Sequence, residues 1–101
     1  MEQLDNNIVT KNKIDFSELK KWRVIFHNDD KTTVDFVIGV LMEIFNYSNV
    51  SATEITMKIH DEGKSTVGVY TYEIAQQKAS DTLEVAEFYD FPLNVTIERD
   101  E

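Results

Sequence analysis

The spacing of apolar residues switches between every second position and every third or fourth position, and this switching most constrains the fold. Trp22, Val24 and Phe26 alternate with other side chains, which predicts a strand apolar enough to be largely covered on both faces. Over 33–46 the apolar residues return at intervals of three and four, which predicts a strongly amphipathic helix. Thr32 is the expected N-cap of this helix, because its hydroxyl can accept a hydrogen bond from a first-turn amide.

The rest of the chain continues to switch between helix-like and strand-like spacing of its apolar residues. Ser51-Ala52-Thr53-Glu54 is a capping-box sequence, which predicts a short helix that ends near Asp61 with Gly63 as its C-cap. Further on, the pattern predicts a strand over 66–70, a helix over 72–89 and a strand over 93–98. The order β-α-α-β-α-β predicts an α+β fold, in which a small three-stranded antiparallel sheet packs against three helices.

The first twenty residues differ from the rest. Polar side chains dominate residues 1–20, and the few apolar ones follow neither period, so we expect a flexible N-terminal extension. Residues 21–101 are then expected to form one domain, since single domains commonly have about this size.

Charge narrows the class of partner. The chain carries 19 Asp and Glu against 10 Lys and Arg, a formal net charge of −9. Phosphate recognition needs a basic face, so nucleic acid and anionic membranes are unfavourable partners, whereas a cationic ligand is favoured. The absence of cysteine excludes a disulfide framework and a cysteine nucleophile. No apolar run approaches the ~20 residues of a membrane span, so a cytoplasmic protein is expected.

Two polar features could carry chemistry: Asn28-Asp29-Asp30 at the predicted strand-to-helix turn, and His60 at the end of the second helix. Asn and Asp favour turns, so the first feature can be a turn and nothing more. Adjacent carboxylates with a histidine could instead hold a metal ion or divide acid and base roles. A third possibility is a protonated amine, because these oxygens and a neutral imidazole accept N–H bonds. The spacing alone leaves these alternatives open.

Four blocks of sequence place these residues in a wider pattern: Trp22–Thr32 (WRVIFHNDDKT), Asp35–Ile38 (DFVI), His60–Lys64 (HDEGK) and Gly68–Ala75 (GVYTYEIA). Together they closely resemble the ClpS adaptor family, and the resemblance extends over 22–101. It implies an adaptor rather than an enzyme, a monomer without cofactor or metal. Such an adaptor binds substrates with a destabilising N-terminal Leu, Phe, Tyr or Trp. It delivers them to the ClpA or ClpC unfoldase for degradation by the ClpP protease.

The resemblance also assigns roles to single residues. Asn28, Asp29 and His60 would bind the α-amino group of the substrate. The pocket for the first side chain would involve Asp30, Thr32, Val34, Val37, Thr56, Ile59 and Leu93. Glu73 and Lys78 occupy positions at which the family contacts the N-terminal domain of the unfoldase, although on spacing alone they look like solvated helix residues.

Three positions depart from the common pattern of the family. Thr33 replaces a frequent proline, and Val34 and Thr56 replace frequent methionines at the mouth and rim of the pocket. It therefore stays open whether an N-terminal Ile or Val is accepted. Two other functions also stay open: a small metal- or phosphate-handling enzyme that uses the acidic turn and His60, and an interaction module similar to the C-terminal domain of the ribosomal stalk protein.

Overall fold

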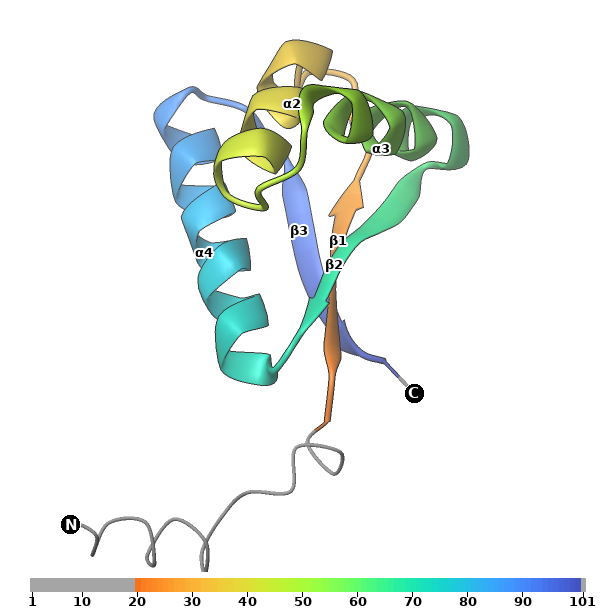
Figure 1. Cartoon of the computed structure of the whole chain (residues 1–101). Coiled ribbons are helices and arrows are strands. Elements are labelled where there is room, and N and C mark those ends of the chain that lie inside the picture. Colours follow the sequence, from red (N-terminus) through yellow and green to blue (C-terminus); the bar gives the residue numbers. More distant parts are fainter. Residues whose placement is uncertain (1–19, 101) are drawn as a thin grey trace, which may run out of the picture.

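The computed structural model describes residues 20–100, and its six elements follow in the order β-α-α-β-α-β (Figure 1). They are β1 (Trp22–His27), α2 (Val34–Glu43), α3 (Asn49–Glu62), β2 (Lys64–Tyr70), α4 (Tyr72–Phe88) and β3 (Asn94–Arg99). This confirms the predicted α+β class and element order. The expected flexible extension covers residues 1–20, of which 1–19 lie outside the described residues.

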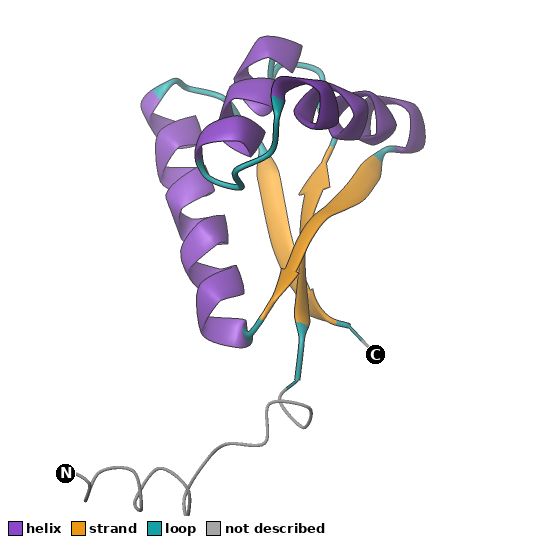
Figure 2. Ribbon diagram, in the orientation of Figure 1, coloured by secondary structure: helices purple, strands orange, loops and turns teal. Residues whose placement is uncertain are grey.

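The three strands form one antiparallel sheet in the order β2-β1-β3. Helix α4 runs along the sheet, while α2 and α3 lie together at the end of the sheet where β1 leads into its loop (Figure 2). Helices cover one face of the sheet (Figure 2), and β1, its middle strand, is flanked by β2 and β3. Val24 and Phe26 are fully buried in the core with the helices, and Ile25, which points to the opposite face, is also buried.

The core lies between the sheet and the helices. Phe26 and Phe45 meet edge to face there, with ring centroids 5.5 Å apart. Gly68 pairs with Val24, and a Cβ at position 68 would lie only 2.6 Å from Cζ of Tyr70. The ring of Tyr70, from the same strand, therefore occupies the space that a side chain at position 68 would need. None of the described helices is both long enough and apolar enough to cross a membrane.

Both predicted N-caps of the first two helices are wrong. The cap of α2 is Thr33, whose hydroxyl accepts a hydrogen bond from the amide of Phe36 (3.1 Å). Thr32 belongs to the preceding turn instead. The cap of α3 is Ser48, which accepts from the amide of Ser51 (3.1 Å), so the predicted capping box lies inside the helix. The sequence has several Ser and Thr residues near the start of each helix. The one that acts as the cap is the residue at which the backbone enters the helix, and the side-chain type alone does not identify it.

Two further ends differ from the prediction by two residues or more. Helix α2 ends at Glu43 rather than near 46, and Asn46 has a positive φ of 64° that reverses the chain. Strand β2 begins at Lys64 rather than 66, because its pairing with β1 starts opposite His27. The C-cap prediction is confirmed: Gly63 has φ 89°, and its amide donates to the carbonyl of Ile59 (2.9 Å).

Candidate functional site

The loop after β1 and the last turn of α3 are neighbours because β1 and β2 are paired. Strand β2 starts directly after the C-cap of α3, and its first residue, Lys64, pairs with His27. The amide of Asn28 extends this pairing by donating to the carbonyl of Gly63 (2.8 Å). The structure thereby brings the acidic turn beside His60, although about thirty residues separate them in the sequence.

A hollow of ≈ 300 Å³ opens between this loop, the first turn of α2 and the helix α3. Its lining residues are Asn28, Asp29, Asp30, Thr32, Thr33, Val34, Val37, Thr56, Ile59 and His60. All the residues predicted for amine binding and for the pocket are therefore together, except Leu93. Leu93 lines a smaller hollow of ≈ 20 Å³. The residues that line both hollows are Asn28, Asp29, Thr32, Val37 and Ile59.

The polar side of the hollow is organised by the carboxylate of Asp29. Its Oδ1 accepts hydrogen bonds from the amides of Lys31 (2.8 Å) and Thr32 (2.7 Å). Its Oδ2 accepts from the hydroxyl of Thr32 (2.7 Å). A carboxylate offers about four lone-pair positions, so one position on Oδ2 is left for a ligand. Asp29 therefore fixes the shape of the loop and still has an acceptor to offer.

These hydrogen bonds keep Asp29 ionised. Partial burial raises the pKa of its carboxyl, but the bonds from the amide and hydroxyl of Thr32 and from the amide of Lys31 outweigh the burial. The pKa of Asp29 is consequently below its ordinary value of 3.8, and the hollow holds a fixed negative charge at neutral pH. Asn28 and His60 line the same hollow with exposed side chains, so both are open to a ligand.

The apolar side of the hollow belongs to the core. Val37, Thr56 and Ile59 are buried, and the hydroxyl of Thr56 is turned to its own helix, where it donates to the carbonyl of Ala52 (2.7 Å). Val34, the first residue of α2, is 43% exposed and stands at the mouth. The floor is thus rigid and apolar, whereas the mouth is open.

Thr33 is the one lining residue of the hollow for which the sequence predicted no role in binding. It stood out in the sequence only because it replaces a proline that is frequent at this position in the family. The sequence did contain a signal that Thr33 rather than Thr32 caps α2. An aspartate often accepts a hydrogen bond from the backbone amide three residues later, so the spacing of Asp29 and Thr32 indicates that Thr32 belongs to a turn before the helix.

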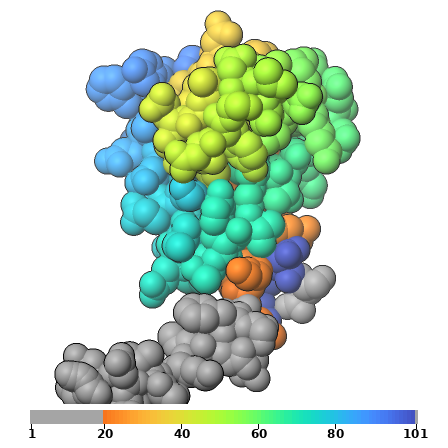
Figure 3. Space-filling view, viewed as in Figure 1, coloured from red at the N-terminus to blue at the C-terminus, as the bar shows by residue number. Residues whose placement is uncertain are grey.

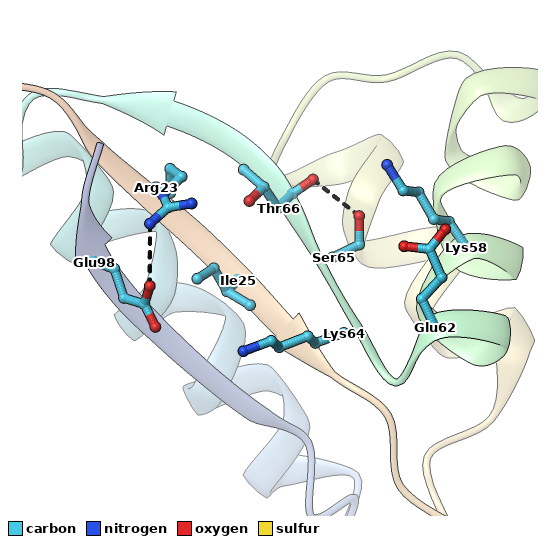
Figure 4. Close-up of a pocket in the computed structure, with 8 residues that line it drawn as sticks. All are labelled: Arg23, Ile25, Lys58, Glu62, Lys64, Ser65, Thr66 and Glu98. Carbon is cyan, nitrogen blue, oxygen red and sulfur yellow. Dashed lines mark hydrogen bonds and ion pairs between the residues drawn. The ribbon is translucent and has the colours of Figure 1, made fainter. Parts of the chain in front are cut away.

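A second hollow, of ≈ 260 Å³, lies on the uncovered face of the sheet, and its lining is mostly charged (Figure 4). Arg23 pairs there with Glu98 (3.2 Å). The Nε of Arg23 also lies 3.8 Å from Asp100. Such pairs are usual on the solvated face of an antiparallel sheet.

The two residues predicted for the unfoldase contact differ in their surroundings. Glu73 is exposed in the first turn of α4. Lys78 is half-buried: its ammonium donates to the carbonyl of Ile44 (2.7 Å) and lies 5.5 Å from the ring centroids of Phe45 and Tyr70. Lys78 thus ties α4 to the end of α2. The expectation that it looks like a solvated helix residue is wrong.

Within residues 20–100, no three His, Asp or Glu side chains lie close enough to bind a metal ion together. The carboxylate of Asp29 is already engaged by its own loop. The arrangement is suited to accept N–H bonds from a cation above an apolar floor.

Comparisons with known proteins agree with this geometry. The family model described as "ATP-dependent Clp protease adaptor protein ClpS" matches residues 17–96. The chain is 44% identical to the ATP-dependent Clp protease adapter protein ClpS of Helicobacter hepaticus, over 80% of this chain and 82% of that protein. It is 41% identical to the ClpS of Acetivibrio thermocellus, over 84% and 86%. A solved structure of Agrobacterium tumefaciens ClpS2 bound to L-phenylalaninamide superposes with a TM-score of 0.80 at 31% identity, and it covers 82% of this chain and all of that one.

Proposed function

The chain belongs to the ClpS family of Clp protease adaptors, and on this premise we propose that its ≈ 300 Å³ hollow binds the N-terminal residue of substrate polypeptides. Asn28, Asp29 and His60 accept the N–H bonds of the free α-amino group. Val34, Val37 and Ile59, with Leu93 beneath them, surround the first side chain. The preferred first residues are Leu, Phe, Tyr and Trp.

The observation that carries this proposal is the carboxylate of Asp29, which stands at the edge of a hollow with an apolar floor and keeps one acceptor position for a ligand. An α-amino group has a pKa of ~7.7–8.0 and is mostly charged at neutral pH, and charge-assisted hydrogen bonds are about twice as strong as neutral ones. The volume, ≈ 300 Å³, is at the small end of the range for ligand cavities, so it suits one residue. The L-phenylalaninamide bound by the Agrobacterium protein has the same chemistry, a free α-amino group beside an apolar side chain.

The same residues favour binding over catalysis. Among residues 20–100, the hydroxyl of Thr32 is the only one in the hollow that is hydrogen-bonded to a carboxylate, and its partner Asp29 has a lowered pKa. A general base works best with a pKa near the operating pH, so Asp29 is poorly suited to take a proton from a hydroxyl. We therefore propose that the protein is an adaptor and not an enzyme.

We further propose that the adaptor hands its substrates to a ClpA- or ClpC-type unfoldase for degradation by ClpP. Family membership supports the link to the Clp protease. Exposed Glu73 on α4 would contact the N-terminal domain of the unfoldase, and it lies on a helix that does not line the hollow, so both partners could bind at once. Lys78 would act in this interface chiefly by fixing α4 against α2.

A panel of peptides that differ only at the first residue tests the proposed function. We expect N-terminal Leu, Phe, Tyr and Trp to bind, and N-terminal Asp, Lys and Gly to bind at least tenfold more weakly by fluorescence anisotropy. Equal affinity across the panel would contradict the proposal and favour an interaction module that ignores N-termini. Titration of the protein with Mg²⁺ and Zn²⁺ under the same conditions would reveal the metal-dependent alternative.

A further inference from the structure

A second groove lies between α2 and α4, away from the proposed substrate hollow. It has a volume of ≈ 360 Å³, and its apolar lining includes Phe36, Val40, Ile44 and Val85. Both helices lie on the face shown in Figure 3. Helix α2 packs mainly along α3, so the backbones of α2 and α4 stay apart and leave the groove open.

The groove has two features that incomplete packing of the domain does not explain. Gly39 stands in the middle of α2, where a glycine costs about 0.5–1 kcal/mol relative to alanine. A Cβ at this position would meet nothing within 4 Å, so packing within the domain does not require the glycine. Tyr89, which lines the groove, is 58% exposed, and Phe88, whose ring contacts that of Tyr89, is 80% exposed, which leaves large apolar surface uncovered.

The charge of the groove indicates which kind of segment could bind there. Its charged lining residues are two carboxylates, Asp35 and Glu43, and neither has a cationic partner within residues 20–100. They stand eight residues apart on α2, about 12 Å along the helix axis. An apolar floor with a carboxylate at each end fits a short segment that combines apolar side chains with lysine.

We propose that residues 8–14 of this same chain (IVTKNKI) dock in the groove. The segment contains Ile8, Val9 and Ile14 for the apolar floor, and Lys11 and Lys13 for the two carboxylates, with no acidic residue between its ends. Acidic residues lie only on either side of it within the first nineteen residues.

The connection to the domain makes even a weak contact sufficient. With residues 8–14 in the groove, the tether runs from Ile14 to Trp22, eight residues that can span up to about 27 Å, somewhat more than the length of β1. A tethered segment meets its site at an effective concentration of about a millimolar. A dissociation constant in the millimolar range would therefore fill the groove in about half of the molecules.

A paramagnetic label in the full-length chain tests the proposal. Because the chain has no cysteine, Thr10→Cys provides a single site for a nitroxide. We expect the amide signals of Gly39, Glu43 and Val85 to lose more than half of their intensity relative to the reduced label. The amide of Thr66, on the uncovered face of the sheet, should be much less affected.

Two variants of the labelled chain control the result. Gly39→Leu fills the groove without a clash at Cβ and should restore the signals of Glu43 and Val85, whereas Gly39→Ala should largely keep the broadening. Lys11→Glu with Lys13→Glu should restore the signals, while the same pair changed to Arg should not. Equal broadening of groove and sheet amides would overturn the proposal. Broadening that appears only between separate labelled and unlabelled molecules would also overturn it and would assign the groove to a second copy.

Discussion

At the scale of single residues, Asp29 combines two tasks. Three hydrogen bonds from Lys31 and Thr32 hold its carboxylate in place, and the same bonds lower its pKa and keep its charge. Since the folded pKa lies below 3.8, these bonds stabilise the fold above about pH 4. They are lost as the pH falls through the folded pKa, when the carboxylate takes up a proton.

Asp29→Ala should therefore affect both binding and stability. We expect affinity for an N-terminal Leu peptide to fall at least tenfold, because the amine loses its charged acceptor. The free energy of unfolding should fall by about 1–2 kcal/mol through the lost loop bonds, with a single cooperative transition in urea. Asp61→Ala removes the same charge from an exposed position outside the hollow and should change neither quantity appreciably. Unchanged affinity in Asp29→Ala would exclude Asp29 as the amine acceptor.

Val34, at the mouth of the hollow, should set the tolerance for branched ligands. Methionine would reach further over a ligand's β-carbon than valine does. A clash there costs about 1–3 kcal/mol, more than the ~0.8 kcal/mol of one buried methylene. We expect peptides with N-terminal Ile or Val to bind measurably, though below Leu, and Val34→Met to widen the gap between Leu and Ile. An unchanged Leu-to-Ile affinity ratio would show that position 34 does not control the mouth.

At the scale of elements, the sequence predicted where the helices and strands lie better than it predicted where they begin and end. The alternation in β1 and the three-four spacing in α2 placed both elements, because side-chain burial imposes those periods directly. The caps were misplaced, because Thr32 and Thr33 are chemically equivalent and only the bond from Thr32 to Asp29 distinguishes them. The contacts of Lys78 could not be predicted from the sequence either, because its hydrogen-bond partner, the carbonyl of Ile44, lies 34 residues away in the chain.

Lys78→Met should destabilise the packing of α4 on α2. It removes the hydrogen bond to the carbonyl of Ile44 and the contacts with two aromatic rings, so the free energy of unfolding should fall by about 1–2 kcal/mol. Lys58→Met, at an exposed site on α3, should change it by less than about 0.5 kcal/mol. Urea unfolding followed by Trp22 fluorescence measures both. Equal stability of the two variants would mean that Lys78 is only a surface charge.

At the scale of the whole molecule, the pairing of β1 with β2 builds the site. It places the turn after β1 against the last turn of α3, which no local pattern in the sequence could predict. The resemblance to the ClpS family supplied that juxtaposition in advance, residue by residue, whereas apolar spacing alone could not separate pocket from core at Val37 and Ile59. In the structure, Val37 and Ile59 belong to the hydrophobic core and also line the hollow.

The division between recognition and delivery belongs to this scale as well. All the proposed contacts with the peptide lie within residues 28–93. Deletion of residues 1–17 should therefore leave peptide affinity unchanged and abolish stimulated degradation by the cognate unfoldase and protease. Degradation assays with a Leu-initiated reporter measure the second effect. Full delivery by the shortened protein would show that these residues have no part in it.

The measurement that tests the central claim most directly compares one Leu-initiated peptide with its N-acetylated form. Acetylation removes the positive charge and two N–H donors, so the remaining acceptor position of Asp29 loses its cationic donor. Loss of such a charged contact costs about 2–5 kcal/mol. By fluorescence anisotropy at pH 7, we expect the acetylated peptide to bind at least tenfold more weakly. Equal affinity of the two forms would contradict the claim that this hollow recognises a free α-amino group.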